Sequence, residues 1–162
     1  AAIGVQPFDQ PEVASAKAAT VAVLDSGDTS VELTPLAELL EQIQPGDHVA
    51  LQGFVDPEGA EAAVLARVAD VLRAQHRVAV SIGFGPRFLH STGQLHKGGP
   101  DAIVCIQLHA DDADEIPIPG RSFGFGHLLA AQAAGDLHAL RDRNRRAGRV
   151  TIQELRAVGG SV

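Results

Sequence analysis

Histidines, cationic side chains, hydroxyl groups and glycines are concentrated in one stretch of this chain, residues 83–100, which reads GFGPRFLHSTGQLHKGGP. Glycine permits positive φ angles and lets backbone N–H groups come close to an anion, while lysine and arginine supply the matching charge. The composition of the stretch therefore predicts a loop that binds a phosphorylated ligand. The side chains expected to contact that ligand are Arg87, His90, Ser91, Thr92, Gln94, His96 and Lys97.

Other kinds of site fit this stretch less well. Gly83-Phe-Gly85 resembles the start of a dinucleotide-binding fingerprint, but Phe88 stands where a small residue is required. His90 and His96 have no acidic residue at a spacing typical of a zinc site. Ser91 lacks the G-x-S-x-G context of a hydrolase nucleophile. We therefore expect neither a metal nor a cofactor here.

The stretch lies between two segments that have the pattern of buried strands, residues 77–83 and 102–108. Another apolar segment, 48–55, and an amphipathic helix at 57–75 complete a right-handed strand–helix–strand unit with parallel strands. The predicted fold is α/β: an open, mostly parallel sheet with flanking helices, preceded by an N-terminal helical segment. Such sheets bind ligands beyond the carboxyl ends of their strands, where residues 83–100 emerge.

Further segments complete this fold. Helices are expected at about residues 13–24, 36–43 and 128–140, with Asp136 and His138 on the rim of the last one. Residues 150–153 have the pattern of a final strand, and 157–162 that of a frayed tail. The polar, turn-rich residues 25–30 form the best internal boundary. Two units, 1–30 and 31–162, are therefore expected.

Composition narrows the class of protein. The chain of 162 residues has a net charge of -7, which argues against nucleic acid as a partner. The arginines at 141, 143, 145, 146 and 149 are expected to have a solvated structural role at a helix end. A single Cys105 excludes an internal disulfide and indicates a reducing, cytoplasmic location. No apolar run is long enough for a membrane span. The lack of methionine indicates a processed product or a piece of a longer polypeptide.

Residues 4–17, near the N-terminus, read GVQPFDQPEVASAK. Taken alone, Lys17 on a short helix has the pattern of a solvated residue. The segment nevertheless resembles the signature near the C-terminal end of glucose-6-phosphate isomerases, approximately N-x-F-D-Q-x-x-V-x-x-x-K. The resemblance implies that Gln10 and Lys17 lie at the active site, and that Lys17 is the catalytic lysine that takes part in opening the sugar ring and contacts the substrate.

Residues 85–99, together with 118–120 and 131–137, are similar to the C-terminal extension of the long bacterial isomerases, which also occurs where a transaldolase is fused ahead of the isomerase. The resemblance covers nearly the whole chain. It implies that residues 1–30 end the sugar-isomerase domain and that 31–162 form an α/β extension domain. It also implies three kinds of partner: a sugar phosphate, the upstream isomerase domains of the same polypeptide, and further copies in a homo-oligomer.

The isomerase family carries its catalytic glutamate, its ring-opening histidine and its phosphate-holding serine/threonine loops upstream of the signature. We therefore expect residues 1–162 alone to be unable to interconvert glucose 6-phosphate and fructose 6-phosphate, the reaction of glycolysis and gluconeogenesis. One alternative is a noncatalytic module for phosphosugar binding or subunit interaction, holding a phosphate through Arg87, Lys97 and backbone amides. Another is a part of a bifunctional transaldolase and phosphoglucose isomerase.

Overall fold

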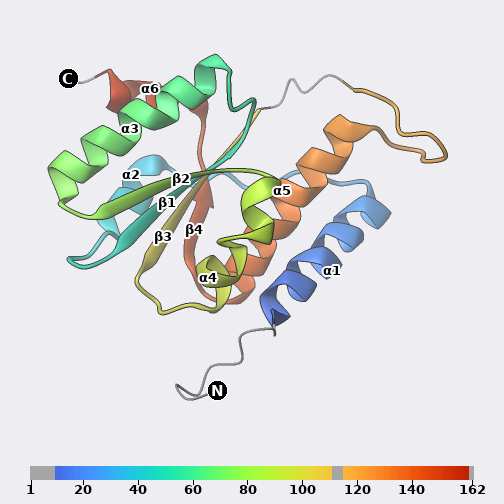
Figure 1. Cartoon of the computed structure of the whole chain (residues 1–162), viewed down its shortest axis with the longest axis horizontal. Coiled ribbons are helices and arrows are strands. Elements are labelled where there is room, and N and C mark those ends of the chain that lie inside the picture. Colours follow the sequence, from blue (N-terminus) through green and yellow to red (C-terminus); the bar gives the residue numbers. More distant parts are fainter. Residues whose placement is uncertain (1–9, 111–114, 161–162) are drawn as a thin grey trace.

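The structure, a computed structural model, describes residues 10–110 and 115–160. Four parallel strands form one open sheet in the order β2-β1-β3-β4: β1 His48–Phe54, β2 Ala79–Phe84, β3 Ile103–His109 and β4 Arg146–Arg149 (Figure 1). Helices flank the sheet on both faces, and a helix precedes it, so the predicted fold class is confirmed. Residues 4–9 of the signature-like segment and the last two residues of the expected tail lie outside the described ranges.

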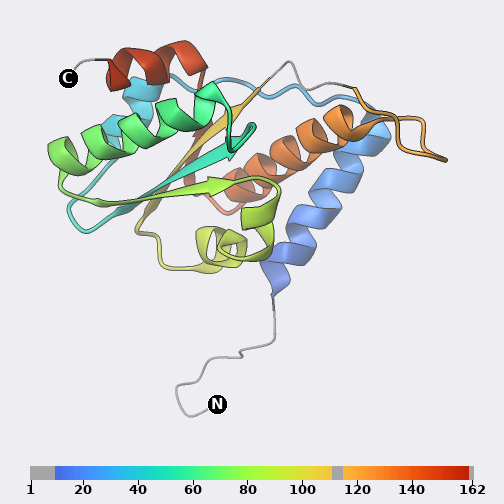
Figure 2. The same ribbon diagram turned by 45° about the horizontal axis from the view of Figure 1, so that its top comes forward.

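One face of the sheet packs against aliphatic side chains. Helices α2 (Leu36–Glu41), α3 (Ala60–His76) and α6 (Ile152–Gly159) cover it, and α3 lies beside α6 in both ribbon views (Figures 1 and 2). Alternate strand residues such as Val49, Leu51, Val104 and Ile106 point into this core because successive strand side chains face opposite sides. Burial of this continuous aliphatic cluster is the main source of stability that the structure displays.

The opposite face is covered by α5 (Phe125–Asp142) and the short helix α4 (Gly93–Gly98), and α1 (Pro11–Ser26) lies outside them (Figure 2). Helices α1 and α5 come very close together at Gly135, where a Cβ atom would lie 2.6 Å from the backbone nitrogen of Thr20. Val23 packs against the alanines of α5 on the same seam. Small residues at a helix crossing thus place α1 firmly against the sheet domain.

Residues 85–100 do not form an open loop. They contain a 3-10 turn, η1 (Arg87–His90), and α4, which together connect β2 to β3 across the α5 side of the sheet. The expectation that their glycines adopt positive φ is wrong, because the glycines with positive φ in the described chain are Gly27, Gly46 and Gly120. The glycines of the stretch permit close packing instead. At Gly85, for example, a Cβ atom would collide with the ring of Phe54.

The C-terminal region also differs from its prediction. The last strand is β4, which ends at Arg149, directly before the expected strand 150–153, and a helix, α6, includes the first three residues of the expected tail. The reason is a capping box: the Thr151 hydroxyl accepts from the Glu154 backbone N–H, while the Glu154 carboxylate accepts from the Thr151 N–H at 2.9 Å. This start signal outweighs the strand preference of the neighbouring β-branched residues. Across the described ranges, no helix is long and apolar enough to cross a membrane.

Candidate functional site

The two segments that resemble the isomerase family meet in space. The backbone N–H of Glu12, in the first turn of α1, donates to the Gln94 side-chain oxygen on α4 at 3.1 Å. The Glu12 carboxylate, which is almost fully buried, forms an ion pair of 2.6 Å with Arg143 at the end of α5. A side chain from each of two elements therefore fixes the start of α1, and with it the helix that carries Lys17.

A pocket of about 280 Å³ opens between α1, the segment from η1 to α4, and α5. Its apolar wall consists of Val13, Ala16, Val21 and Leu89. Its polar lining consists of Lys17, Thr20, His90, Lys97 and Gln132. The volume is near the lower end of the range for small-molecule sites, and mostly apolar walls with a few polar groups are typical of such sites.

Three of the predicted site residues line this pocket together: Lys17, His90 and Lys97. Lys17 is exposed, and its side chain has neither an ion pair nor a hydrogen bond to any other residue in the described ranges, so its ammonium group is available to a ligand. Lys97 is the opposite case, since only 2% of its surface is exposed. The pocket therefore has one cation at its surface and one at its buried end.

The other predicted site residues lie elsewhere. Exposed side chains outside the pocket lining are those of Gln10, Arg87, Ser91 and Thr92. Gln94 is occupied by its contact with α1, and His96 is buried against the sheet. Arg87 and Lys97, which were expected to grip one phosphate together, do not both line the pocket.

The ammonium of Lys97 forms an ion pair with Asp136, which comes from the middle of α5 and has no exposed surface. Burial raises the pKa of Asp136, and the positive charge of Lys97 opposes that rise. The second carboxylate oxygen, Oδ2, has no hydrogen-bond partner among the described residues. The pair is therefore electrically neutral as a unit and keeps one acceptor atom unused.

A second buried polar contact lies next to this pair. Gln52, on β1, places its amide nitrogen 3.0 Å from Nδ1 of His96. An amide nitrogen can only donate, so Nδ1 accepts and a neutral His96 ring carries its proton on Nε2. Burial, with help from the charges of Lys97 and His48, lowers the pKa of His96 to about 4. His96 is therefore neutral at physiological pH and is unsuited to hold an anion.

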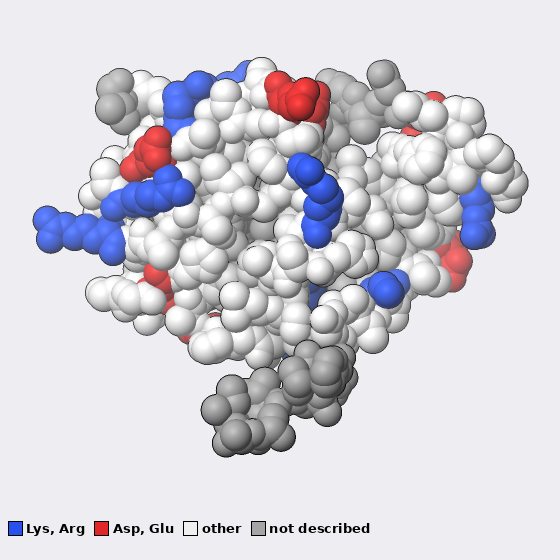
Figure 3. All heavy atoms as spheres, viewed as in Figure 1, with Lys and Arg blue, Asp and Glu red and all other residues white. Residues whose placement is uncertain are grey.

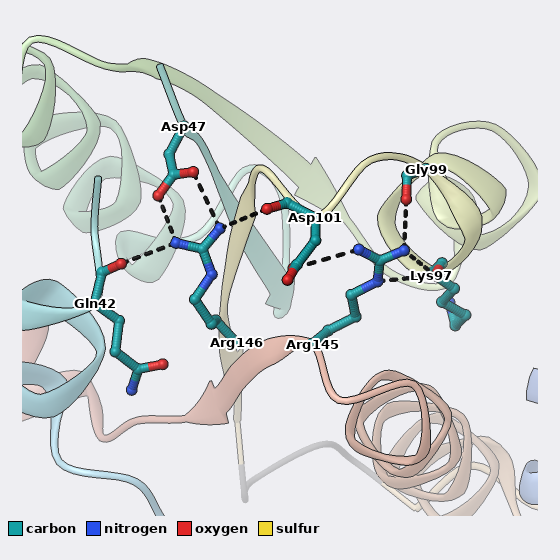
Figure 4. Close-up of polar contacts among 7 residues, drawn as sticks. All are labelled: Gln42, Asp47, Lys97, Gly99, Asp101, Arg145 and Arg146. Atoms are coloured by element: carbon teal, nitrogen blue, oxygen red, sulfur yellow. Dashed lines mark hydrogen bonds and ion pairs between the residues drawn. The ribbon is translucent and has the colours of Figure 1, made fainter. Parts of the chain in front are cut away.

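Arginines fix the elements around the site (Figure 4). Arg145 donates to the carbonyl of Lys97 at 2.8 and 2.9 Å and to that of Gly99 at 2.5 Å, so it caps the C-terminal end of α4. Arg146 forms a bidentate contact with Asp47 at 2.6 and 3.0 Å, which lowers the pKa of that carboxyl. The sequence predicts a solvated structural role for the arginine cluster. Most of these arginines instead form contacts within the protein. On the face shown in Figure 3, charged residues are scattered and form no continuous basic patch.

The sequence reasoning missed two polar residues of the pocket lining, Thr20 and Gln132, and two buried ones, Asp136 and Gln52. Asp136 was expected on the rim of its helix, and the structure shows that this is wrong, because it is fully buried. The signal was present in the spacing: Leu129, Ala133, Asp136 and Leu140 recur at intervals of four, three and four residues, which places Asp136 in the inward stripe of α5. A carboxylate within an apolar stripe indicates a buried partner, here Lys97.

The arrangement suits binding of a small polar molecule more than metal chemistry. In the described part of the chain, no group of three or more histidine, cysteine or acidic side chains could hold a metal ion. Cys105 is buried under α5, and burial raises its pKa to about 12, so its thiol is a poor nucleophile. The groups available to a ligand are the ammonium groups of Lys17 and Lys97 and the polar side chains beside them in the pocket.

Comparison with known proteins adds information about the fold alone. No family model and no curated protein matches the chain. Among solved structures, it is similar to the hypothetical protein TT0462 from Thermus thermophilus, with a TM-score of 0.62 and 16% sequence identity. The match covers 91% of this chain and 42% of that protein, so the chain spans less than half the length of its structural neighbour.

Proposed function

We propose that this chain is the C-terminal portion of a glucose-6-phosphate isomerase and that Lys17 is its contribution to catalysis. The observation that carries the proposal is the position of Lys17: it is an exposed cation that lines a pocket and has no ion pair with the described residues. That pocket is formed where the signature-like helix α1 meets the segment similar to the bacterial extension.

The chemistry of ring opening explains the need for such a residue. Opening a pyranose requires a proton to reach the ring oxygen and another to leave the anomeric hydroxyl, and a nearby ammonium group stabilises the negative charge that develops. Helix α1 holds Lys17 in place because its first turn is tied to α4 and α5 through Glu12. A positioned charge acts with little reorganisation.

The remaining steps belong to upstream parts of the polypeptide in this proposal. Proton transfer between the two carbons of the substrate requires a carboxylate base, and the resemblance places that glutamate, together with the phosphate-holding loops, before the signature. The proposed enzyme is cytoplasmic and homo-oligomeric, and it occurs either alone or fused behind a transaldolase. The noncatalytic alternative receives less support, because Arg87 lies outside the pocket and Lys97 is committed to Asp136.

A coupled assay tests the proposal. Isomerase turnover should be absent from the purified chain of 162 residues and present in the product of the complete open reading frame. In that product, Lys17→Met should lower kcat by about 10²–10⁴-fold, the usual range for a proton-transfer or charge-stabilising group. Arg67→Met, which removes an exposed cation of α3 on the other face of the sheet, is the matched control and should leave turnover unchanged. Turnover by the isolated chain, or full activity of Lys17→Met, would refute the proposal.

A further inference from the structure

The buried end of the pocket has a different chemistry from its rim. Lys97 lines the pocket, and Asp136 lies directly behind its ammonium group. The two charges cancel, so an incoming ligand meets a dipole and not a net positive charge. A phosphate group placed against Lys97 would also approach the buried Asp136 carboxylate, and this like-charge approach in a poorly solvated site is unfavourable.

A hydroxyl group fits this end better than an anion does. The Lys97 ammonium has three N–H donors; one serves Asp136, and a second points to the Gly93 carbonyl at a long 3.5 Å. Its remaining donor capacity can serve a ligand oxygen. Asp136 lies outside the pocket lining and its Oδ2 is fully buried, so the carboxylate acts on a ligand only through Lys97. A hydroxyl group can accept from this ammonium and can also donate to the amide oxygen of Gln132, which lines the same pocket.

The walls of the pocket agree with this assignment. Val13, Ala16, Val21 and Leu89 offer apolar surface to the C–H groups of a carbon chain, whereas a phosphate would leave its oxygens without donors there. Gln132, one helical turn before Asp136 on α5, adds an amide group that both donates and accepts. The pocket therefore combines apolar contact with paired donors and acceptors, which is the pattern that a neutral polyol requires.

We infer that the pocket is a subsite for the hydroxyl-bearing carbon chain of a sugar, with Lys97 as the contacting residue and Asp136 as its positioning residue. The phosphate of a sugar phosphate remains outside this subsite. In naming a sugar, the inference rests on the proposed function. It extends that function by specifying which part of the substrate the extension domain recognises.

The test uses the complete chain of 162 residues, isotope-labelled for NMR, and two probes: sorbitol, a neutral polyol, and inorganic phosphate. Sorbitol should cause saturable shifts at the amide groups of the pocket residues on α1, α4 and α5. Phosphate should neither reproduce these shifts nor displace sorbitol. Absence of saturable sorbitol shifts, or displacement of sorbitol by phosphate, would overturn the inference.

A double substitution, Lys97→Met/Asp136→Val, removes both charges together and replaces a buried ion pair by apolar side chains, an exchange that proteins usually tolerate. It should weaken sorbitol binding by about tenfold or more, because the hydrogen bond to the charged Lys97 ammonium is lost. Arg67→Met should bind sorbitol like the unaltered chain. Unchanged binding by the double variant would show that Lys97, positioned by Asp136, does not recognise the polyol. Since this assay measures binding without turnover, its failure is distinguishable from failure of the isomerase proposal.

Discussion

Replacing Lys97 alone by methionine should destabilise the protein by about 3–5 kcal/mol, the usual cost of removing one partner from a buried ion pair. Both partners of this pair are almost completely buried, since the exposed fraction is 2% for Lys97 and 0% for Asp136. The substitution leaves the Asp136 carboxylate without a counter-charge. Because folded domains are stable by only about 5–15 kcal/mol, this loss is a large share of the total.

Adding Asp136→Val to Lys97→Met should restore most of the lost stability. Removal of both charges eliminates the uncompensated carboxylate, and replacement of a whole buried pair by apolar groups is often neutral or stabilising. The double-mutant cycle should therefore give a coupling free energy of about 2 kcal/mol or more, within the range for residues in direct contact. Urea unfolding followed by far-UV circular dichroism is the appropriate assay, because the chain contains neither tryptophan nor tyrosine for fluorescence.

The pH dependence of the single variant provides a second readout. Burial raises the pKa of Asp136 above its ordinary value of 3.8, so the folded state binds the proton more tightly than the unfolded state does. The stability that the protonated Asp136 carboxyl confers is fully present below pH 3.8, and it is lost as the pH rises through the pKa of Asp136 in the folded state. Lys97 lowers the pKa of Asp136, so its removal should raise that pKa further. The loss of stability should then extend to higher pH. Lys97→Met should therefore lose stability relative to the unaltered protein as the pH rises.

Two results would refute this reasoning. The first is a single variant, Lys97→Met, that unfolds at the same urea concentration as the unaltered protein. The second is a double variant no more stable than the single one, which would mean that the carboxylate of Asp136 is not desolvated as the contacts indicate. An unchanged slope of the unfolding transition in each variant is the necessary control, because a changed slope indicates altered compactness and not simply altered stability.

Two further predictions concern packing and reactivity. Gly135→Ala should destabilise the protein by about 1–3 kcal/mol and increase hydrogen exchange in α1, because the new methyl group would meet the Thr20 backbone. Gly159→Ala is the control, because a Cβ atom there would lie 3.5 Å from its nearest neighbours, an ordinary contact distance. This control should be neutral or slightly stabilising. Burial raises the pKa of Cys105 to about 12, so its thiol should react with a reagent such as dithionitrobenzoate only after unfolding in urea. Rapid reaction of the folded chain would contradict the buried position of Cys105 under α5.

The general fold could be predicted because its signals are local. Residues 57–75 repeat apolar side chains at helical intervals, and α3 follows at Ala60–His76; the β-branched run at 102–108 corresponds to β3. Residues 83–100 misled the prediction because glycine is a poor helix former. Helix α4 nevertheless begins and ends with a glycine, and at Gly98 a Cβ atom would come too close to Gln94 and Glu12. Tertiary packing, which no local pattern contains, decides the conformation there.

The site was predictable only in part for a similar reason. Lys17, His90 and Lys97 were chosen from residue type and resemblance, and the fold brings them to one pocket. The ion pair that changes the chemistry of Lys97 joins residues 39 positions apart in the sequence, and no spacing rule connects α4 with the middle of α5. Residue type alone therefore makes Lys97 a phosphate ligand, whereas its buried partner makes it a group better suited to hydroxyls.

The two faces of the sheet differ in a way that explains how such a site is sustained. The face under α3 is aliphatic, whereas the face under α4 and α5 carries paired polar side chains, among them His48 with Ser81 at 2.8 Å and Gln52 with His96 at 3.0 Å. Gln52 and Gln107 are also register partners on β1 and β3, so this polar strip crosses neighbouring strands. Buried polar groups contribute little net stability and are costly when unpaired. The aliphatic face therefore stabilises the fold, and this allows the other face to hold a charged pair at the end of a ligand pocket.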